Sequence, residues 1–151
     1  INLEDSFAIR DLQERYATES DKNNQDYYSE LFVKNVRLRV YFYGELGMQA
    51  DDVDSMIKQY KAFGAAKASF HQNGQHVIPG DTHATGTAYA LATLVNNENG
   101  KDVVTLHTVR YYDKYVKIDG RWWIAEREQH FVYTAKQDVV KSEDAEKVKR
   151  E

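Results

Sequence analysis

The sequence predicts an α+β domain in which N-terminal helices pack on one face of a curved antiparallel sheet. Two features of the chain indicate this class. Apolar residues recur at steps of three and four over much of the first 64 residues, which is typical of amphipathic helices. From about residue 68 onward, long runs rich in β-branched and aromatic residues are separated by short turn sequences. Because helices come first and strands follow, we expect the helices to cover the sheet instead of alternating with parallel strands.

The first two helices are expected before residue 33. The first begins behind an N-cap at Asp5 or Ser6 and runs to Asp21. Its apolar face repeats at steps of three and four: Ile9, Leu12 and Tyr16. A run of cap-type residues, Glu19 to Asn24, breaks this pattern. A second, short helix then presents one apolar and aromatic face: Tyr27, Tyr28, Leu31 and Phe32.

A third helix is expected before the four strands of the second half of the chain. Asp51 and Asp52 are suited to cap its start, and Gly64 is suited to end it. Its apolar face is made of five residues: Val53, Met56, Ile57, Tyr60 and Phe63. The spacing of these residues predicts that this helix also packs against the sheet.

Five strands are expected. Residues 36–43 alternate in polarity and are bounded by Gly44 and Gly47. The other four strands make up the second half of the chain: residues 69–78, 82–95, 103–118 and 121–135. Asp119-Gly120, between the last two, is a hairpin signal. These last two strands far exceed the usual length of about five or six residues, and long antiparallel strands bend, so the sheet is able to wrap around a cavity.

The chain has 151 residues, which is enough for one domain that buries about 70% of its unfolded surface. We expect residues 1–137 to form this domain and residues 138–151 to form a charged tail. Residues 141–151 within it contain basic and acidic residues in equal number and should be frayed helix or disordered.

Composition excludes several classes of protein. There are no cysteines, which excludes disulfide scaffolds and thiolate metal sites and favours a reducing compartment such as the cytoplasm. The net charge of −4 argues against a nucleic-acid partner, and no apolar run is long enough to span a membrane. Aromatic residues are abundant, at 13%, and eleven of them are tyrosines. We interpret the tyrosines as the lining of an apolar pocket.

Small residues recur on one face of the strand 82–95: Ala84, Gly86, Ala88, Ala90 and Ala92. A face this small lets either a helix or a ligand come close to the sheet. In the last strand, Arg127 shares its parity with Trp123 and Phe131, which places it on the more aromatic side. A cation there is either a paired core residue or a group that stabilises an anion.

The five histidines show no metal-binding pattern. The chain has no HExxH pair, and His71 and His76 are separated by an odd number, so they should face opposite sides of their strand. An exposed or hydrogen-bonded structural role is the simplest interpretation of each, above all for His76 and His83, which flank a turn. We therefore expect no metal and no cofactor.

Three stretches, taken together, resemble the SnoaL-like proteins of the nuclear transport factor 2-like superfamily. Residues 112–124 contain Tyr-Asp followed by Asp-Gly-Arg-Trp, as in the C-terminal hairpin of that family. Residues 9–21 resemble its opening helix, with a tyrosine near the end and an aspartate just beyond. Residues 70–89 resemble its histidine, Gly-Asp and small-residue strand. The resemblance covers residues 5–135 and implies a cone-like sheet wrapped around the N-terminal helices.

The resemblance also implies a site. Relatives include scytalone dehydratase, bile acid 7α-dehydratase and hexachlorocyclohexane dehydrochlorinase, which use an Asp–His pair inside the cone. The matching positions here are Asp21 and His71 for the pair, with Tyr16 and Arg127 as further catalytic residues and His130 as a pocket position. We expect the aromatic side chains of four more residues to contact the substrate: Tyr28, Tyr41, Tyr112 and Trp123.

These residue types suit proton abstraction beside a carbonyl. A histidine held by a carboxylate acts as a base, while a phenol or guanidinium stabilises the anion that forms. The sequence therefore predicts a cofactor-independent lyase of the dehydratase type, or an isomerase, acting on an apolar, cyclic small molecule. The alternative is a module that binds small molecules or mediates association without turnover. A third hypothesis is a metal-dependent variant that uses His71 with another histidine. We also expect a homo-oligomer, either a dimer or a trimer, formed through the open face of the sheet.

Overall fold

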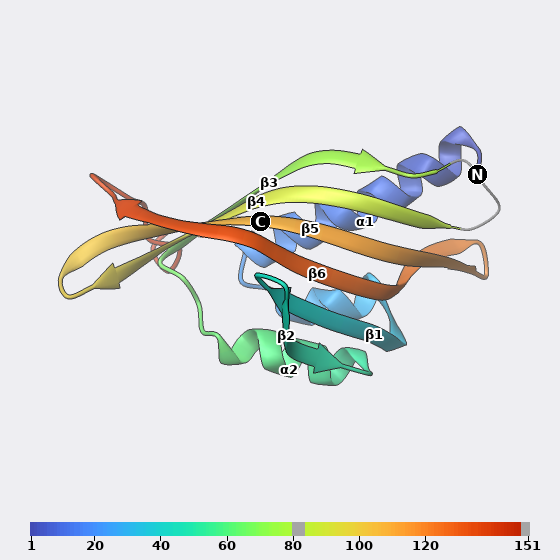
Figure 1. Ribbon diagram of the computed structural model, residues 1–151, viewed down its shortest axis with the longest axis horizontal. Helices are drawn as coiled ribbons and strands as arrows, with labels where there is room; N and C mark the ends of the chain where they lie inside the picture. The colour runs from blue at the N-terminus through green and yellow to red at the C-terminus, as the bar shows by residue number, and fades with distance from the viewer. Residues whose placement is uncertain (80–83, 149–151) are drawn as a thin grey trace.

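The computed structural model describes residues 1–79 and 84–148, which form an α+β fold with one curved, unclosed sheet of six strands. Figure 1 shows the sheet in front and α1 behind it, with α2 below, beside β1 and β2. The elements follow in this order: α1 (Leu3–Asp21), η1 (Gln25–Glu30), β1 (Phe32–Phe42), β2 (Glu45–Ala50), α2 (Val53–Ala62), β3 (Ala68–Val77), β4 (Thr85–Glu98), β5 (Lys101–Ile118) and β6 (Arg121–Asp138). The predicted fold class is therefore confirmed.

The strand order across the sheet is β2-β1-β6-β5-β4-β3. Four of the five neighbouring pairs are antiparallel, as predicted, but β1 pairs with β6 in parallel. The chain therefore returns to β1 through its last strand, β6, which runs in the same direction. The sheet is thus mixed, and its two central strands are β6 and β5.

Helix α1 starts earlier than its apolar pattern predicted. Its N-cap is Asn2, whose side chain accepts the backbone N–H of Asp5, so the expected caps Asp5 and Ser6 lie inside the first turn. Acidic residues in a first turn favour the helix through its dipole, which explains their position there. The predicted face made of Ile9, Leu12 and Tyr16 is buried against the sheet.

The segment after α1 differs from the prediction. The expected second helix is a six-residue 3₁₀ helix, η1, and Phe32 already belongs to β1. Strand β2 was not predicted, because Gly47 reads as the end of a strand although it lies inside β2. Gly47 is required there, since a Cβ would stand 2.5 Å from the ring of Phe42.

The third helix and the last hairpin agree with the prediction. Helix α2 is capped by Asp52, whose carboxylate accepts the backbone N–H of Ser55 at 2.7 Å. Asp119 and Gly120 both have positive φ angles, of 50° and 80°, as a two-residue hairpin turn requires. The predicted turn after Pro79 and the role expected for His83 fall on residues 80–83, which lie outside the described residues.

The inner face of the sheet, which faces the helices, holds the core. The small residues predicted to share one face of β4 do so: Ala88, Ala90 and Ala92 are buried in the core. Beyond β6, residues 139–148 form turns and no helix, and the backbone N–H of Ala145 donates to the carbonyl of Lys67 at 2.7 Å. Within the described residues, no helix is long and apolar enough to cross a membrane.

Candidate functional site

The structure brings Asp21 and His71 into direct contact, although fifty residues separate them. Asp21 is the last residue of α1, and His71 lies on the neighbouring strand, β3. Carboxylate oxygen Oδ1 of Asp21 lies 2.6 Å from Nδ1 of the His71 ring, and Oδ2 accepts the backbone N–H of His71 at 2.8 Å. The hydroxyl of Ser69 donates to Oδ1 at 2.8 Å. The predicted contact is therefore confirmed.

The surroundings of this pair favour a charged carboxylate. Burial raises the pKa of Asp21, but hydrogen bonds from the His71 ring, the His71 backbone and Ser69 more than offset it and hold that pKa below its ordinary value. A carboxylate beside Nδ1 favours the tautomer that carries its proton there, so the lone pair lies on Nε2. The side chains of His71 and Asp21 are 12% and 26% exposed, so the pair is accessible from outside the core.

A second histidine, His107, lies two strands away on the same inner face. His71 and His107 both pair with Ala92, so their side chains lie on the same face with one small side chain between them. The His107 ring lies 3.1 Å from the hydroxyl of Thr134 and edge-on to Phe131. Burial and the nearby His71 lower the pKa of His107. Sequence reasoning gave this residue no role, because the signal that finds it is the strand register.

Tyr16, a predicted catalytic residue, lies in an aromatic cluster deeper in the cone. Its ring stacks on Tyr28 at 5.0 Å and stands edge-on to Tyr111 and Phe32. The Tyr28 hydroxyl lies 2.6 Å from that of Ser20, which is next to Asp21. Burial raises the pKa of Tyr28 and of Tyr111, so both phenols stay protonated and keep their hydroxyl hydrogens for donation.

Arg127 lies behind this cluster and is only 1% exposed. Its Nε and Nη2 each donate to Asp113 at 2.8 Å, and Nη2 also donates to Gln13. The guanidinium carbon stands 4.1 Å from the ring centre of Tyr111 and 4.6 Å from that of Tyr16. Of the two roles left open for this residue, the structure therefore shows the paired core residue.

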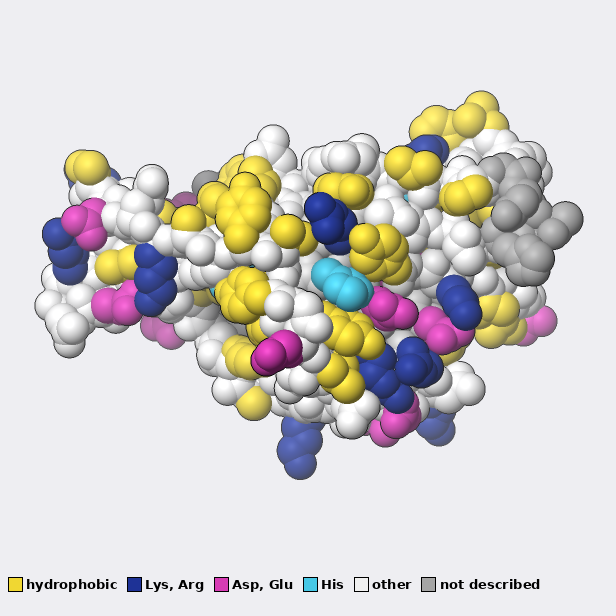
Figure 2. Space-filling model, in the orientation of Figure 1, with side chains coloured by type: hydrophobic (Ala, Val, Ile, Leu, Met, Phe, Trp, Pro, Cys, Tyr) yellow, Lys and Arg dark blue, Asp and Glu magenta, His cyan; other side chains and the backbone are white. Residues whose placement is uncertain are grey.

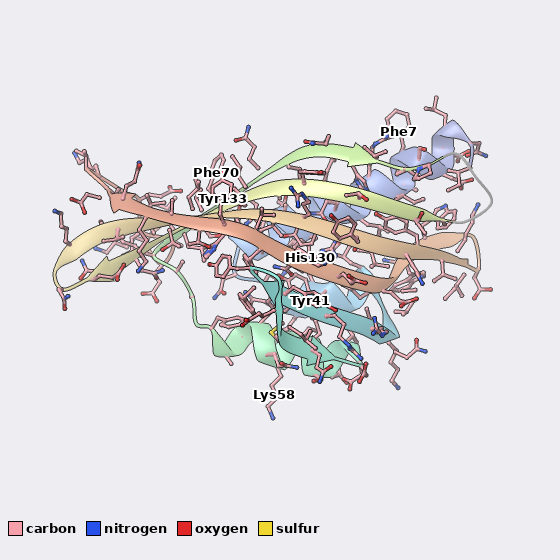
Figure 3. All side chains as sticks on the ribbon, viewed as in Figure 1. Phe7, Tyr41, Lys58, Phe70, His130 and Tyr133 are labelled. Atoms are coloured by element: carbon pink, nitrogen blue, oxygen red, sulfur yellow. The ribbon has the colours of Figure 1, made fainter. Side chains whose placement is uncertain are left out.

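Three predicted pocket residues lie on the outer face of the sheet instead. His130 stacks on Tyr41 at 4.6 Å with the rings 6° apart, and Tyr112 stands edge-on to His130 at 5.2 Å. Figure 3 shows His130 and Tyr41 side by side on the face opposite the helices. Because Arg127 and Gln129 point inward, the alternation of a strand turns His130 outward. This placement corrects the expectation that the three residues share a pocket with His71.

Trp123 is also displaced from the expected face, and a β-bulge is the cause. Ile124 pairs with Tyr115 and Glu126 pairs with Lys114, so Ala125 is an extra residue in β6. The bulge reverses the alternation, and Trp123 therefore faces away from Arg127. Its ring lies under the guanidinium of Arg121, 3.8 Å away. Of the four aromatic residues expected to line the pocket, only Tyr28 lies on the inner face.

Two further features of the described residues bear on function. A hollow of about 430 Å³ lies on the outer face, between Gln72, Tyr89, Arg110 and Tyr133, on the opposite side of the sheet from His71. No group of three or more acidic, histidine or cysteine side chains within residues 1–79 and 84–148 could hold a metal ion. The contact between Asp21 and His71 is thus the feature with the clearest acid–base chemistry.

Comparison with known families agrees with this geometry. The family described as the SnoaL-like domain matches residues 2–128, which is most of the chain. The chain belongs to this family. Membership supports an enzymatic or ligand-binding role for this SnoaL-like domain. No curated protein sequence is similar enough to it to count as a match.

Solved structures share the fold of this SnoaL-like domain. A candidate scytalone dehydratase from Novosphingobium aromaticivorans is 22% identical, with 95% of this chain and 94% of that chain covered and a TM-score of 0.73. A hexachlorocyclohexane dehydrochlorinase from Novosphingobium barchaimii is 13% identical, with 93% and 94% covered and a TM-score of 0.69. A candidate aromatic-ring hydroxylase from N. aromaticivorans is 17% identical, with 93% and 96% covered and a TM-score of 0.74. At these identities the likeness shows the fold alone.

Proposed function

We propose that this protein is a cofactor-independent lyase of the dehydratase type, or an isomerase, that acts on an apolar, cyclic small molecule. The observation that carries the proposal is the 2.6 Å contact between Asp21 Oδ1 and His71 Nδ1 on the inner side of the sheet. A histidine oriented in this way by a carboxylate has the base-and-orienter arrangement of a catalytic triad without its nucleophile. The matching fold of a dehydratase-type protein and a dehydrochlorinase supports the same chemistry.

In the proposed reaction, Nε2 of His71 takes a proton from the carbon beside a carbonyl. The electrons of the broken C–H bond form a carbon–carbon double bond, and negative charge moves to the carbonyl oxygen. In elimination, the enolate expels a hydroxide at the next carbon, which leaves as water with the proton that His71 returns. In isomerisation, His71 returns that proton to another carbon of the same molecule. Asp21 stabilises the imidazolium during both steps.

The lining of the inner face supports an apolar substrate with one polar handle. The walls beside His71 and His107 are alanine and aromatic rings, which favour a hydrophobic ring system. We assign Tyr16 as the phenol that donates to the carbonyl oxygen, where negative charge develops. Arg127 stands behind the Tyr16 ring and contributes through it. His107 lies across Ala92 from the base and is placed to contact the leaving group.

The test measures turnover of a panel of cyclic β-hydroxy and β-halo carbonyl compounds. The absorbance of the conjugated product monitors the reaction. His71→Ala and Asp21→Asn should each reduce kcat by about 10²-fold or more, because general-base catalysis has that magnitude. The matched control is His130→Ala, since His130 also lies beside a carboxylate, that of Glu128 at 3.2 Å, but on the outer face. Turnover within about tenfold of wild type in both dyad variants would contradict the proposal.

A binding module without turnover is the second candidate. The observation that favours it is the burial of the polar groups in the cone: Tyr16, Tyr28 and Arg127 are each no more than 3% exposed. Calorimetry with the same panel separates the two functions. The binding module would be established if a compound binds saturably, no product forms, and His71→Ala leaves the affinity unchanged.

A further inference from the structure

The outer face of the sheet carries a hollow of about 430 Å³ that plays no part in the site around His71. It crosses β3, β4, β5 and β6, and Figure 3 shows one of its lining residues, Tyr133, on this face. Six of the residues that line it matter for binding: Gln72, Gln75, Tyr89, Leu91, Arg110 and Tyr133. Because the hollow and His71 lie on opposite sides of the sheet, a ligand here would not compete with a substrate on the inner face.

Two β-bulges shape the hollow. In β3, Gly74 and Gln75 together lie opposite Tyr89, where a regular strand would place one residue. In β6, Val132 is an extra residue of the strand. A bulged strand bends and twists more strongly at that point. The two bends flank β4 and β5, and the hollow lies between them, where Gly74 has no side chain to fill the space beside Tyr89.

Arg110 supplies a positive charge that no acidic group of the described residues neutralises. Its guanidinium carbon lies 5.5 Å from the ring centre of Tyr89, and within residues 1–79 and 84–148 no hydrogen bond or ion pair holds its N–H groups. The carboxylate of Glu128, two residues from the register partner of Arg110, contacts His130 instead, at 3.2 Å. A guanidinium that lies over a ring keeps its edge free, and that edge matches the two oxygens of a carboxylate.

The other walls of the hollow suit an aromatic ring. Leu91 and Tyr133 are 40% and 58% exposed, so they present apolar surface to a ligand. The carboxamides of Gln72 and Gln75 add neutral hydrogen-bond donors on β3. The whole chain carries a net charge of −4, which repels anions, so an anion would be held here only by its local contact with Arg110.

We propose that this hollow is a second ligand site, separate from the inner face, that binds a small aromatic carboxylate. The carboxylate accepts hydrogen bonds from the guanidinium of Arg110, and the ring of the ligand lies against Leu91 and Tyr133. The site is independent of the proposed function, because it shares no residue with the pair of Asp21 and His71. Copies of the chain that associate through the outer face would enclose the ligand between them.

The test is calorimetric titration with 2-naphthoate, a flat aromatic carboxylate. The wild-type protein should bind it at one site per chain. Arg110→Gln removes the charge but keeps a hydrogen-bond donor, so it should weaken binding about tenfold or more, the factor that corresponds to one charge-assisted hydrogen bond. The neutral 2-naphthamide, which has the same ring, should bind the wild-type protein more weakly by a similar factor.

The matched control makes the same substitution at another arginine that lies over a ring. The guanidinium carbon of Arg121 stands 3.8 Å from the ring centre of Trp123, but Arg121 lies outside the hollow and pairs with Glu30 at 3.6 Å. Arg121→Gln should keep the wild-type affinity for 2-naphthoate. His71→Ala should keep it too, because His71 faces the other side of the sheet. Circular dichroism establishes that each variant folds.

Four results would overturn the inference. They are no binding by the wild-type protein, an unchanged affinity in Arg110→Gln, an equal loss in Arg121→Gln, and a loss in His71→Ala, which would place the ligand on the inner face. A second copy of the chain is the competing occupant of the hollow, and light scattering on the same samples detects it. If 2-naphthoate binds only at dilutions at which the protein is monomeric, the second copy fills the hollow and the inference is wrong.

Discussion

At the scale of single residues, partners decide what each histidine does. His71 contacts the carboxylate of Asp21 and lies 12% exposed, which suits a base. His76, on the same strand, lies 2.9 Å from the hydroxyl of Tyr115, in the network that continues to Asp113 and Arg127. His130 stacks on Tyr41 outside the cone. Spacing along the chain does not assign these roles, and the neighbours of each of these histidines in the structure do.

His76 should make the stability of the protein dependent on pH. Burial lowers its pKa to about 4; the charge of Asp113 opposes this, while Arg127 and Arg10 add to it. The unfolded chain therefore takes up the proton first, so this stability is fully present above about pH 6.5 and falls as the pH drops toward 4. We expect a loss of the order of 2–3 kcal/mol, measured by urea denaturation across this range. His76→Gln should flatten the slope, and an equal slope in both proteins would contradict the assignment.

Gly86 has no side chain, which leaves room for the contact between His76 and Tyr115. A Cβ at this position would stand 2.9 Å from the Tyr115 hydroxyl oxygen and 3.3 Å from Nε2 of His76. Gly86→Ala should therefore destabilise the protein by about 1–3 kcal/mol, as overpacking of a core does. Thermal denaturation measures the loss. Gly74→Ala is the control for crowding, because a Cβ there meets only ordinary contacts, the nearest 3.5 Å away on Tyr89. Equal losses at the two positions would show that crowding at Gly86 is not the cause.

At the scale of elements, β-bulges decide which side chains enter the cone. Ala125 is the extra residue of β6, and it lets both Ile124 and Arg127 point inward although three positions separate them. A second irregularity, between Phe131 and Tyr133, leaves Phe131 inside and Tyr133 58% exposed. Strict alternation therefore predicts the wrong partners for Trp123, and the sequence carries no clear sign of either bulge.

Deletion of Ala125 tests the role of the first bulge. Without it, regular pairing would turn either Ile124 or Arg127 out of the core, because adjacent register positions face opposite sides. We expect a loss of at least about 3 kcal/mol, since a buried apolar residue or a buried ion pair is disrupted. Urea denaturation measures it, with Ala125→Ser as the variant that keeps the bulge. If the protein that lacks Ala125 has the same free energy of unfolding as Ala125→Ser, this role of the bulge is contradicted.

At the scale of the whole molecule, the open face of the sheet carries an apolar surface. Phe70 and Tyr133, next to each other in Figure 3, are 64% and 58% exposed, and Leu91 nearby is 40% exposed. Figure 2 shows hydrophobic side chains gathered over this part of the sheet, with a histidine and charged groups beside them. An exposed apolar patch rimmed by charges is typical of an association surface. We therefore keep the prediction of a homo-oligomer formed through this face.

Light scattering tests that prediction. Phe70→Asp with Tyr133→Asp should convert the dimer or trimer to monomers, because charged groups would be buried in the contact. Phe7→Asp on α1 is the matched control, since Phe7 is 65% exposed and lies away from the outer face. A monomeric wild-type protein at micromolar concentration, or an equal effect of the control, would contradict the prediction.

The sequence by itself determined the class of fold and much of its order. Helical spacing fixed the buried face of α1, and Asp119-Gly120 fixed the last hairpin, because these patterns depend on residues close together in the chain. The resemblance of three stretches brought Asp21 and His71 forward as a pair. Strand β2 was not predicted, since Gly47 interrupts its pattern of alternating residues.

Only the tertiary structure decided which residues face the cone. His107 lies on the same face as His71 because both residues pair with Ala92. Tyr41, Tyr112 and His130 lie on the outer face, although the sequence predicted them in the pocket. Arg127 became a core cation because Asp113 lies opposite it in the register. The physical reason is that face and partner in a sheet depend on register, and one extra residue in a strand reverses both.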